Sequence, residues 1–386
     1  MNTTTRTGIR RAVSRTRDPQ RAAQELAEAL RLPETALAFF FCSPEYELDA
    51  LGRELGRRFA DVPLIGCTTA GEITPEGYHG ASVTGAALPA DAFTVASVLI
   101  ENLDRFEMSD APRLCARLAG QLGRELGAIA PQNTFGFLLI DGLSLREEGV
   151  ISALYNSLGH IPIFGGSAAD GLAFGRTRIY ADGAFHDNAA VFALIHTTRP
   201  FAVFKTQHFV ATPRKMVVTG ADVTRRVVTE INGEPAAQEY AEMVGIPPAK
   251  LNPLVFATRP VVVRIGGADY VRSIQRANAD GSLTFYCAID EGLVLALADS
   301  VDMVQNLETL FQQLRGEVGE PELVIGCDCI LRKLEMERRD LTDRVSRLLA
   351  DNHVIGFSTY GEQYQAMHVN QTFTGVAIGT RETRHG

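Results

Sequence analysis

Two residues of this sequence lie in settings where a nucleophile could act. Cys67 follows a glycine in the stretch Gly66-Cys-Thr-Thr-Ala70, and such a thiol becomes a nucleophile when a nearby histidine activates it. The sequence identifies no such histidine. Ser167 in Gly165-Gly-Ser-Ala-Ala169 resembles the serine of a nucleophile elbow, but that motif requires a helix directly after the serine, and residues 168–175 have the composition of a loop. Neither stretch therefore predicts an enzyme.

Paired side chains give a second set of candidates. Cys327 and Cys329 alternate on an apolar run, so both thiols face one side of a strand, but the sequence offers no two further ligands at zinc-site spacing. Glu72 and Glu362 end two matching loops. A carboxylate there can serve as a general acid, or it can close the turn by accepting hydrogen bonds from the loop, which is the more ordinary role. The sequence contains no P-loop, no dinucleotide-binding fingerprint and no H-E-x-x-H motif.

The loops just described belong to a repeat. Ile65-Gly-Cys-Thr-Thr-Ala-Gly-Glu72 recurs as Ile355-Gly-Phe-Ser-Thr-Tyr-Gly-Glu362, and a weaker copy is Pro162-Ile-Phe-Gly-Gly-Ser-Ala-Ala169. The first two copies keep a constant offset of 290 residues as far as Gly85 and Gly375. A constant register over that length indicates repeated structural units.

Each copy ends the same kind of segment. An apolar run is followed by apolar residues at helical spacing, and a second apolar run then leads into the Gly/Ser/Thr loop; the first runs cover residues 37–42, 135–140 and 323–330. Short apolar strands that alternate with amphipathic helices predict an α/β fold with buried strands. Such units pair their strands in parallel, so the loops fall at the carboxyl ends of strands, where α/β sheets place ligands. The alternative is a tight turn that needs glycine for its backbone angles and Ser/Thr to bond local amides.

Length and composition limit the classes of protein. The 386 residues, 46% of them hydrophobic, suffice for two domains, and a change of composition near Pro213 divides the chain into residues 1–213 and 214–386. A net charge of −9 without a basic block disfavours nucleic-acid binding. No apolar run approaches the ~18 residues of a membrane helix. Six cysteines, five of them in apolar strand-like runs, and the lack of a secretory signal predict reduced thiols and a cytoplasmic location.

Capping residues, turns and periodicity predict the remaining elements. Helices are expected at residues 18–30, 112–126, 234–244 and 302–314. Strands are expected as a pair at 81–88 and 92–100, as one strand at 201–210, as a meander at 261–289 and as a closing strand at 368–378.

Three separated motifs resemble the FIST sensory module. They are Ile65–Glu72, Ile231-Asn-Gly-Glu-Pro-Ala236 followed by Tyr240, and Gly356-Phe-Ser-Thr-Tyr-Gly-Glu362. The motifs occur in the order found in that family, and the resemblance spans roughly residues 30–380. It implies a module with an N-terminal and a C-terminal domain, built in this chain from the repeated strand-helix-strand-loop units.

Four further stretches resemble a narrower group, the bacterial FIST haemoproteins that sense nitric oxide (NosP). These stretches are Phe204-Lys-Thr-Gln-His-Phe209, Val271-Arg-Ser-Ile-Gln275, Gly281–Gly292 and Cys329-Ile-Leu-Arg332. The resemblance implies haem b bound without covalent attachment, nitric oxide as the signal, and a histidine kinase or cyclic-di-GMP enzyme as the regulated partner. The sequence agrees with non-covalent attachment, since it has no C-x-x-C-H motif. A homodimer is compatible with this interpretation.

A haem that captures a diatomic gas needs one axial imidazole and a dry distal face. Of the eight histidines, His208 is the first choice as the iron ligand, because it lies on a strand near the domain junction beside Phe209, which can line an apolar slot. His196, at the end of an apolar strand, is the second choice, and Cys287 is the thiolate alternative. Each of these residues has a competing interpretation as an ordinary packed core residue.

The other haem contacts follow from charge and aromaticity. Arg272 is the candidate for binding a haem propionate, since it lies on a strand. Tyr270 and Tyr286, with Phe285, are candidates for packing against the porphyrin, although strand aromatics are mostly core or cross-strand partners.

These observations predict a cytoplasmic haem-b sensor of nitric oxide that regulates a partner and has no catalytic activity of its own. The alternative is a FIST sensor that binds a small metabolite, such as an amino acid, in the Gly/Ser/Thr loops without haem. An interaction scaffold and a cysteine hydrolase that uses Cys67 are further alternatives.

Overall fold

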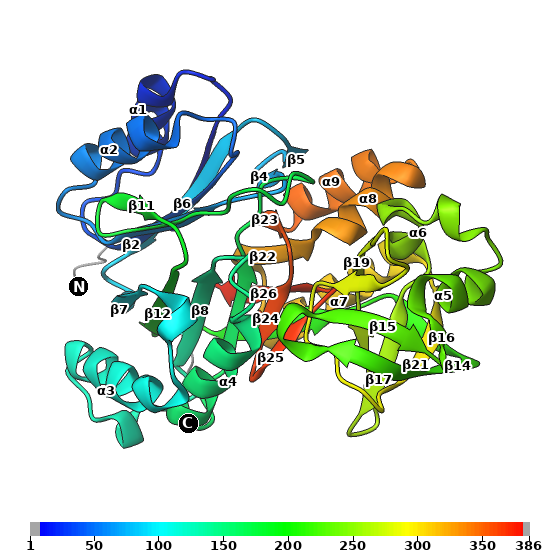
Figure 1. Ribbon diagram of the computed structural model, residues 1–386. Helices are drawn as coiled ribbons and strands as arrows, with labels where there is room; N and C mark the ends of the chain where they lie inside the picture. Colours follow the sequence, from blue (N-terminus) through cyan, green and yellow to red (C-terminus); the bar gives the residue numbers. More distant parts are fainter. Residues whose placement is uncertain (1–7, 381–386) are drawn as a thin grey trace.

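The computed structural model describes residues 8–380 (Figure 1). These residues form three six-stranded sheets, which make up a body, and one curled eight-stranded sheet, which we call the barrel. The body contains residues 8–206 and 303–380, and the barrel, residues 209–300, is inserted between them. In Figure 1 the barrel lies on the right, in green and yellow. Within the described residues, none of the helices combines the length and the apolar character that crossing a membrane would require.

The first unit of the body has the predicted strand-helix-strand order. It consists of β1 (Arg10–Ser14), α1 (Pro19–Ala29), β2 (Thr35–Cys42), α2 (Leu48–Arg58), β3 (Leu64–Thr68) and β6 (Val83–Pro89). The carboxylate of Asp18 caps α1 by accepting a hydrogen bond from the backbone N–H of Arg21, and Pro19 occupies the first turn. Strands β2 and β3 pair in parallel, as the sequence predicted.

The second and third units repeat this order. The second consists of β7 (Phe93–Ile100), α3 (Ala111–Gln121), β8 (Thr134–Ile140), α4 (Glu147–Leu158), β9 (Ile163–Ser167) and β12 (Ala190–Thr197). The third consists of β13 (Phe201–Thr206), α7 (Met303–Val318), β22 (Pro321–Cys329), α8 (Ile330–Arg338), α9 (Thr342–Asp351), β23 (Val354–Thr359) and β26 (Phe373–Gly379). The pairs β8/β9 and β22/β23 are also parallel. The predicted α/β fold and its repeated units are therefore confirmed.

Each unit also gives a short hairpin to a neighbouring unit. The hairpins are β4 (Glu72–Thr74) with β5 (Gly77–His79), β10 (Ile179–Ala181) with β11 (Ala184–His186), and β24 (Glu362–Tyr364) with β25 (Met367–Val369). Strand β4 of the first unit pairs with β23 of the third, β24 of the third pairs with β9 of the second, and β10 of the second pairs with β3 of the first. The exchange is cyclic, so the body has approximate three-fold symmetry and every sheet contains strands from two units.

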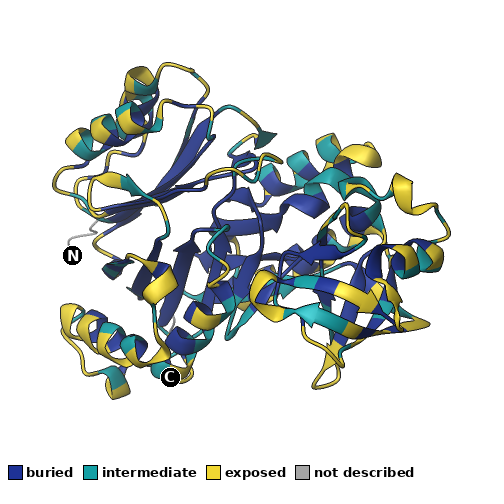
Figure 2. Ribbon diagram, in the orientation of Figure 1, coloured by how far each residue is buried: buried dark blue, intermediate teal, exposed yellow. Residues whose placement is uncertain are grey.

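The inner faces of the three sheets meet in one apolar core. Phe41 of the first unit stacks on Phe357 of the third with 4.4 Å between ring centroids, and Phe39 meets Phe137 of the second unit edge-on at 5.9 Å. Figure 2 shows the buried strands at the centre and the exposed residues on the outer helices. Ring contacts across this core therefore join the units, and each unit also has an apolar cluster of its own beneath its helices.

The barrel has a core of its own. Its strands are β14 (Phe209–Asp222), β15 (Val227–Ile231), β16 (Glu234–Pro235), β17 (Val261–Ile265), β18 (Ala268–Arg272), β19 (Ile274–Ala277), β20 (Leu283–Phe285) and β21 (Val294–Ser300). Helices α5 (Ala236–Val244) and α6 (Pro253–Thr258) accompany them. Strands β18 and β19 are the two ends of the sheet order, yet only Ser273 separates them in the chain. The sheet must therefore curl until its two ends meet.

Several element boundaries differ from those predicted. The strand expected at 201–210 is two strands, β13 and β14, because the chain leaves the body sheet and enters the barrel between them; His208 lies in that link. The pair expected at 81–100 lies in two different sheets, and the closing strand is divided into β25 and β26. The helix expected at 112–126 ends at Gln121. Pro213 lies inside β14, where its pairing with β21 shifts register, as a residue without a backbone N–H allows.

Candidate functional site

The three Gly/Ser/Thr loops interlock at the centre of the body. The carbonyl of Thr68 accepts a hydrogen bond from the N–H of Ala169 at 3.0 Å, and the carbonyl of Ser358 accepts one from the N–H of Ala70 at 2.9 Å. The third equivalent bond joins the carbonyl of Ser167 to the N–H of Tyr360 at 3.4 Å. The loops thus satisfy one another's backbone groups, which supports the interpretation as turns over that of a ligand cradle.

Glu72 and Glu362 close their turns in the same way. Each is fully buried and accepts a hydrogen bond from the threonine three residues earlier. The other carboxylate oxygen of Glu362 accepts bonds from the N–H and hydroxyl of Thr372, as that of Glu72 does from Ser82. Burial raises the pKa of Glu72 to about 7 and that of Glu362 to about 8, although these donors act in the opposite direction. Both carboxyls therefore have the structural role.

The raised pKa of Glu362 predicts a pH-dependent stability. Its folded pKa lies above that of an unfolded glutamate, so the folded state holds an extra proton between the two values. The free energy of unfolding should fall as pH rises from about 5 to about 8, by up to about 1.4 kcal/mol per pH unit. Urea titrations across this range should show a shallower slope for Glu362→Gln than for wild type and for the exposed control Glu317→Gln. Equal slopes for Glu362→Gln and wild type would contradict a raised pKa at Glu362.

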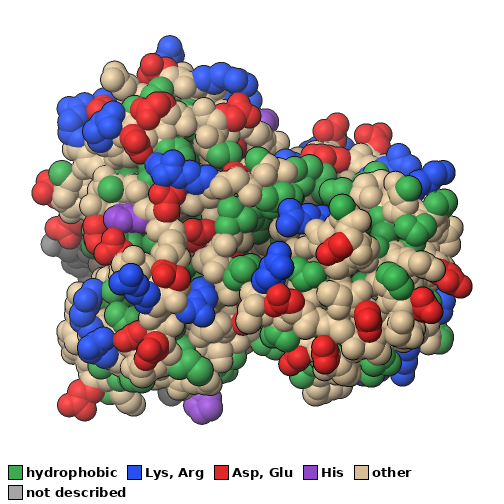
Figure 3. Space-filling model, in the orientation of Figure 1, with side chains coloured by type: hydrophobic (Ala, Val, Ile, Leu, Met, Phe, Trp, Pro, Cys, Tyr) green, Lys and Arg blue, Asp and Glu red, His purple; other side chains and the backbone are tan. Residues whose placement is uncertain are grey.

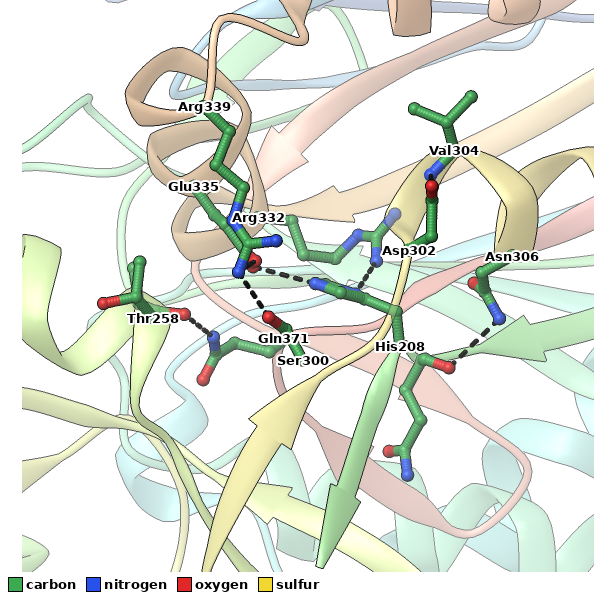
Figure 4. Close-up of polar contacts among 12 residues, drawn as sticks. His208, Thr258, Ser300, Asp302, Val304, Asn306, Arg332, Glu335, Arg339 and Gln371 are labelled. Atoms are coloured by element: carbon green, nitrogen blue, oxygen red, sulfur yellow. Dashed lines mark hydrogen bonds and ion pairs between the residues drawn. The ribbon is translucent and has the colours of Figure 1, made fainter.

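His208 lies in a closed network of charges (Figure 4). Its Nε2 is 2.8 Å from the carboxylate of Glu335, and its Nδ1 is 2.7 Å from Nη1 of Arg332, both on α8. Arg332 also donates to Asp328 at 2.5 Å, and Arg339 forms an ion pair with Glu335 at 2.9 Å. His208, Arg332 and Glu335 have no exposed surface. The network fastens the link between body and barrel to α8.

The network fixes the tautomer of His208 and leaves it no free nitrogen. Because arginine only donates hydrogen bonds, Nδ1 of His208 is the acceptor, and Nε2 carries the proton that it donates to Glu335. Burial lowers the pKa of His208, which keeps the ring neutral. An axial ligand to haem iron needs an unprotonated nitrogen that faces open space. The arrangement of His208 therefore does not fit an axial ligand.

Among the other predicted haem residues, Phe209 packs against His208, whereas His196 and Tyr270 have partners of their own. His196 is bonded through both ring nitrogens, to Thr134 and to Arg124, at 3.1 Å each. Phe209 packs on the His208 ring with 4.2 Å between centroids, and Tyr270 lies under the ammonium of Lys205. These positions are separate from those of Arg272 and Tyr286.

Arg272 and Tyr286 lie where the barrel meets the body. Tyr286 belongs to an apolar cluster with Tyr360, at 6.1 Å between ring centroids. Arg272 hydrogen-bonds to Cys287, and its Nε is a buried nitrogen without a partner. The burial of Cys287 raises the pKa of its thiol. We call this boundary between barrel and body the seam.

The seam contains a group of unpaired polar side chains, which we call the seam cluster: Gln363, His368 and Asn370. Gln363 and Asn370 are fully buried and His368 is 3% exposed. Nε2 of His368, Oε1 of Gln363 and both polar atoms of the Asn370 amide lack hydrogen-bond partners. A Cβ added at Gly361 would lie 2.2 Å from His368 and 2.9 Å from the Asn370 amide nitrogen, so these two side chains converge on a position that only glycine leaves open.

Helix α4 of the body and strand β18 of the barrel pack against the strand that carries His368, which is β25. At the start of α4, Glu147 accepts a hydrogen bond from Arg226 of the barrel at 2.6 Å, and Glu148 binds the same guanidinium. Glu148 also accepts a bond from the N–H of Ala288 at 2.6 Å. Burial lowers the pKa of His368 even though both glutamates oppose the shift, so its ring is neutral.

Comparison with known families identifies the chain. The FIST N domain model matches residues 36–234, and the FIST C domain model matches residues 236–365. The protein belongs to the FIST family. FIST domains are sensory domains, so this protein has a sensory role in signalling.

Individual relatives add little about activity. The uncharacterized protein MJ1623 of Methanocaldococcus jannaschii is 23% identical to this chain in an alignment of length 355, which covers 81% of this chain and 67% of that protein. The crystal structure of a cyanuric acid hydrolase from A. caulinodans aligns with 97% of this chain and 99% of its own, at 10% identity and a TM-score of 0.31. A score this low carries no conclusion about fold or activity.

The repeat of this FIST protein contained a signal for the seam cluster that the sequence analysis missed. With the offset of 290 residues, Gln363 corresponds to Ile73, and Asn370 corresponds to Gly80. Polar residues thus replace apolar and glycine positions in one copy of a structural repeat, which is the pattern expected where one copy has acquired a binding role.

Proposed function

We propose that this FIST protein is a sensor whose signal is a small polar ligand bound by the seam cluster between barrel and body. Its output is the regulation of a partner, a histidine kinase or a cyclic-di-GMP enzyme. The observation that supports this most directly is the pair of unpartnered amide atoms of Asn370, buried beside an unpartnered nitrogen of His368. Buried atoms without a partner also occur elsewhere, for example in Arg332 and Ser358, but in the seam cluster they lie on three neighbouring side chains. The carboxylates of Glu72 and Glu362, in contrast, are hydrogen-bonded.

The unpaired groups give a ligand something to stabilise. Each buried polar group without a partner costs about 1–3 kcal/mol. A ligand that pairs with these groups in the closed seam, and not in an open one, shifts the population toward the closed arrangement. The barrel and the body are joined by two crossing segments near His208, so a change at the seam alters the angle between them. We propose that the partner protein detects this change in the angle between barrel and body.

The chemistry of the seam cluster selects the class of ligand. The Asn370 amide presents a donor and an acceptor side by side, and Arg272 adds an unpartnered Nε–H. Groups that match are an amide, or a carboxylate with a neighbouring amine. A free amino acid or its amide fits this description, in agreement with the alternative of a metabolite sensor.

Gln363→Ile tests the proposal, because the equivalent position of the first unit is the fully buried Ile73. The variant should fold, and without ligand its stability should lie within about 1–3 kcal/mol of wild type. It removes the unpaired Oε1, but it also removes the Nε2 contacts to Ser167 at 3.0 Å and to Nδ1 of His368 at 3.2 Å. Thermal unfolding is measured with each of the common amino acids in turn. At least one of them should raise the unfolding midpoint of wild type and leave that of Gln363→Ile unchanged. A ligand that shifts both equally, or no ligand that shifts wild type, would contradict the proposal.

Nitric oxide sensing through haem b is the finer form of this function that the NosP resemblance implies. It requires His208 to leave Glu335 and Arg332. An absorption spectrum of protein produced with haem supplied decides the matter. A Soret band that disappears in His208→Ala would establish the haem form, whereas the closed network predicts no band that depends on this residue.

A further inference from the structure

A hollow of about 480 Å³ opens beside Arg226, where the barrel meets the loop that precedes α4. Its barrel side includes Arg225 and Arg276, and its body side is Leu145. Pockets of roughly 300–1,000 Å³ are the size that accommodates small organic ligands. The hollow is separate from the seam cluster, since none of Gln363, His368 and Asn370 lines it.

The two arginines give the hollow a positive charge. Both are exposed, and among residues 8–380 neither has a carboxylate within 4.0 Å. The one acid in the lining, Asp280, already accepts hydrogen bonds from the N–H of Ser282 at 3.0 Å and from its hydroxyl at 2.6 Å, and these bonds lower its pKa. Arg225 also contributes electrostatically to this lower pKa, so Asp280 offsets part of the positive charge of the hollow. Guanidinium groups that form no ion pair are donors that bind carboxylate and phosphate groups.

The lining of the hollow also contains apolar side chains, and one of them has a strained backbone. Leu145 is 47% exposed, and its backbone has the left-handed φ of +58°, which a bulky residue rarely adopts. Val227, half-buried, is another apolar residue of this lining. Such strain persists where the surroundings hold the side chain in a useful place. The hollow is therefore lined by both charged and apolar side chains.

We propose that this hollow binds a small organic anion, with its carboxylate or phosphate between Arg225 and Arg276 and its apolar part against Leu145. Acidic and basic side chains are interspersed on the face shown in Figure 3, so recognition of the anion depends on these two arginines and not on a broad basic surface. Because Leu145 belongs to the body and the arginines belong to the barrel, the bound anion also joins the two parts.

Calorimetric titration of the full chain with four probes tests this site. Phenyl phosphate and benzoate carry both an anion and an apolar ring, whereas inorganic phosphate and acetate carry only the anion. We expect saturable binding of at least one ring-bearing probe, roughly tenfold tighter than its ring-free counterpart. Which of the two binds more tightly distinguishes a phosphate from a carboxylate ligand.

Three variants and one control complete the test. Arg225→Ala and Arg276→Ala should each weaken binding of the ring-bearing probe about tenfold, and Leu145→Ala should weaken it without affecting the ring-free probe. Gln363→Ile, which changes the seam cluster, should bind as wild type does, and this separates the hollow from the proposed sensor site. No saturable binding up to about 10 mM, or affinities unchanged by both arginine variants, would overturn the proposal.

Discussion

His208→Ala is expected to lower the free energy of unfolding by about 3–5 kcal/mol, the cost of breaking a buried charged network. The ring of His208 lies between two groups on α8 and hydrogen-bonds to both of them, the guanidinium of Arg332 and the carboxylate of Glu335. Removing it leaves a donor and an acceptor buried without partners and opens a cavity beside Phe209. The expected loss does not depend on haem.

Urea denaturation of haem-free protein measures this effect. His196→Ala is the matched control, because His196 is partly exposed and bonded only to Thr134 and Arg124. The His196→Ala substitution should lower the free energy of unfolding by no more than about 1 kcal/mol. If His208→Ala were as stable as His196→Ala, the network would not hold the barrel in place, and a binding role for His208 would gain support.

Gly356→Ala should prevent the body from folding. A Cβ at this position would lie 1.8 Å from the carbonyl oxygen of Gly326 on the neighbouring strand, a contact with backbone that no side-chain rotation can relieve. Strands β22 and β23 pair at these two residues, so the parallel ladder would have to separate. This glycine of the repeat lies within β23 and is required by the close packing of the two strands.

Two controls make the prediction specific. Gly316→Ala lies on the exposed side of α7 with no atom near the added Cβ, and it should stabilise the protein by about 0.5–1 kcal/mol. Gly66→Ala, in the first unit, would place Cβ 2.6 Å from the carbonyl oxygen of Phe40 and should cost less than the change at Gly356. Soluble yield and circular dichroism should rank Gly316→Ala highest, Gly66→Ala next and Gly356→Ala lowest. A folded, stable Gly356→Ala protein would contradict the prediction.

The repeated units could be predicted from the sequence because their signal is local. Apolar strands of five to nine residues and helices with one apolar face follow each other within each unit, and the structure has them where expected. The exchanged hairpins could not be predicted in this way. Strands such as β4 and β24 have three residues each, too few for a periodic pattern, and their partners are set by the packing of whole units.

The candidate site was predictable only in part for the same reason. His208 was predicted as the iron ligand, whereas the structure places it in a buried network with Arg332 and Glu335. These partners are 124 and 127 residues away and carry no pattern that connects them to it. Asn370 was missed although the repeat pointed to it, since a polar residue in a short turn is ordinary by itself. Only the comparison with Gly80 makes it stand out.

The cyclic exchange of hairpins has a consequence for how the chain is made on the ribosome. The sheet of the second unit lacks its edge until β24 and β25 have been synthesised, and β13 has no partner until β26 has followed. A nascent chain that carries the first two units complete therefore still exposes open strand edges while the barrel is being translated. We expect such intermediates to depend on chaperones, and ribosomes stalled before residue 362 to release aggregating fragments.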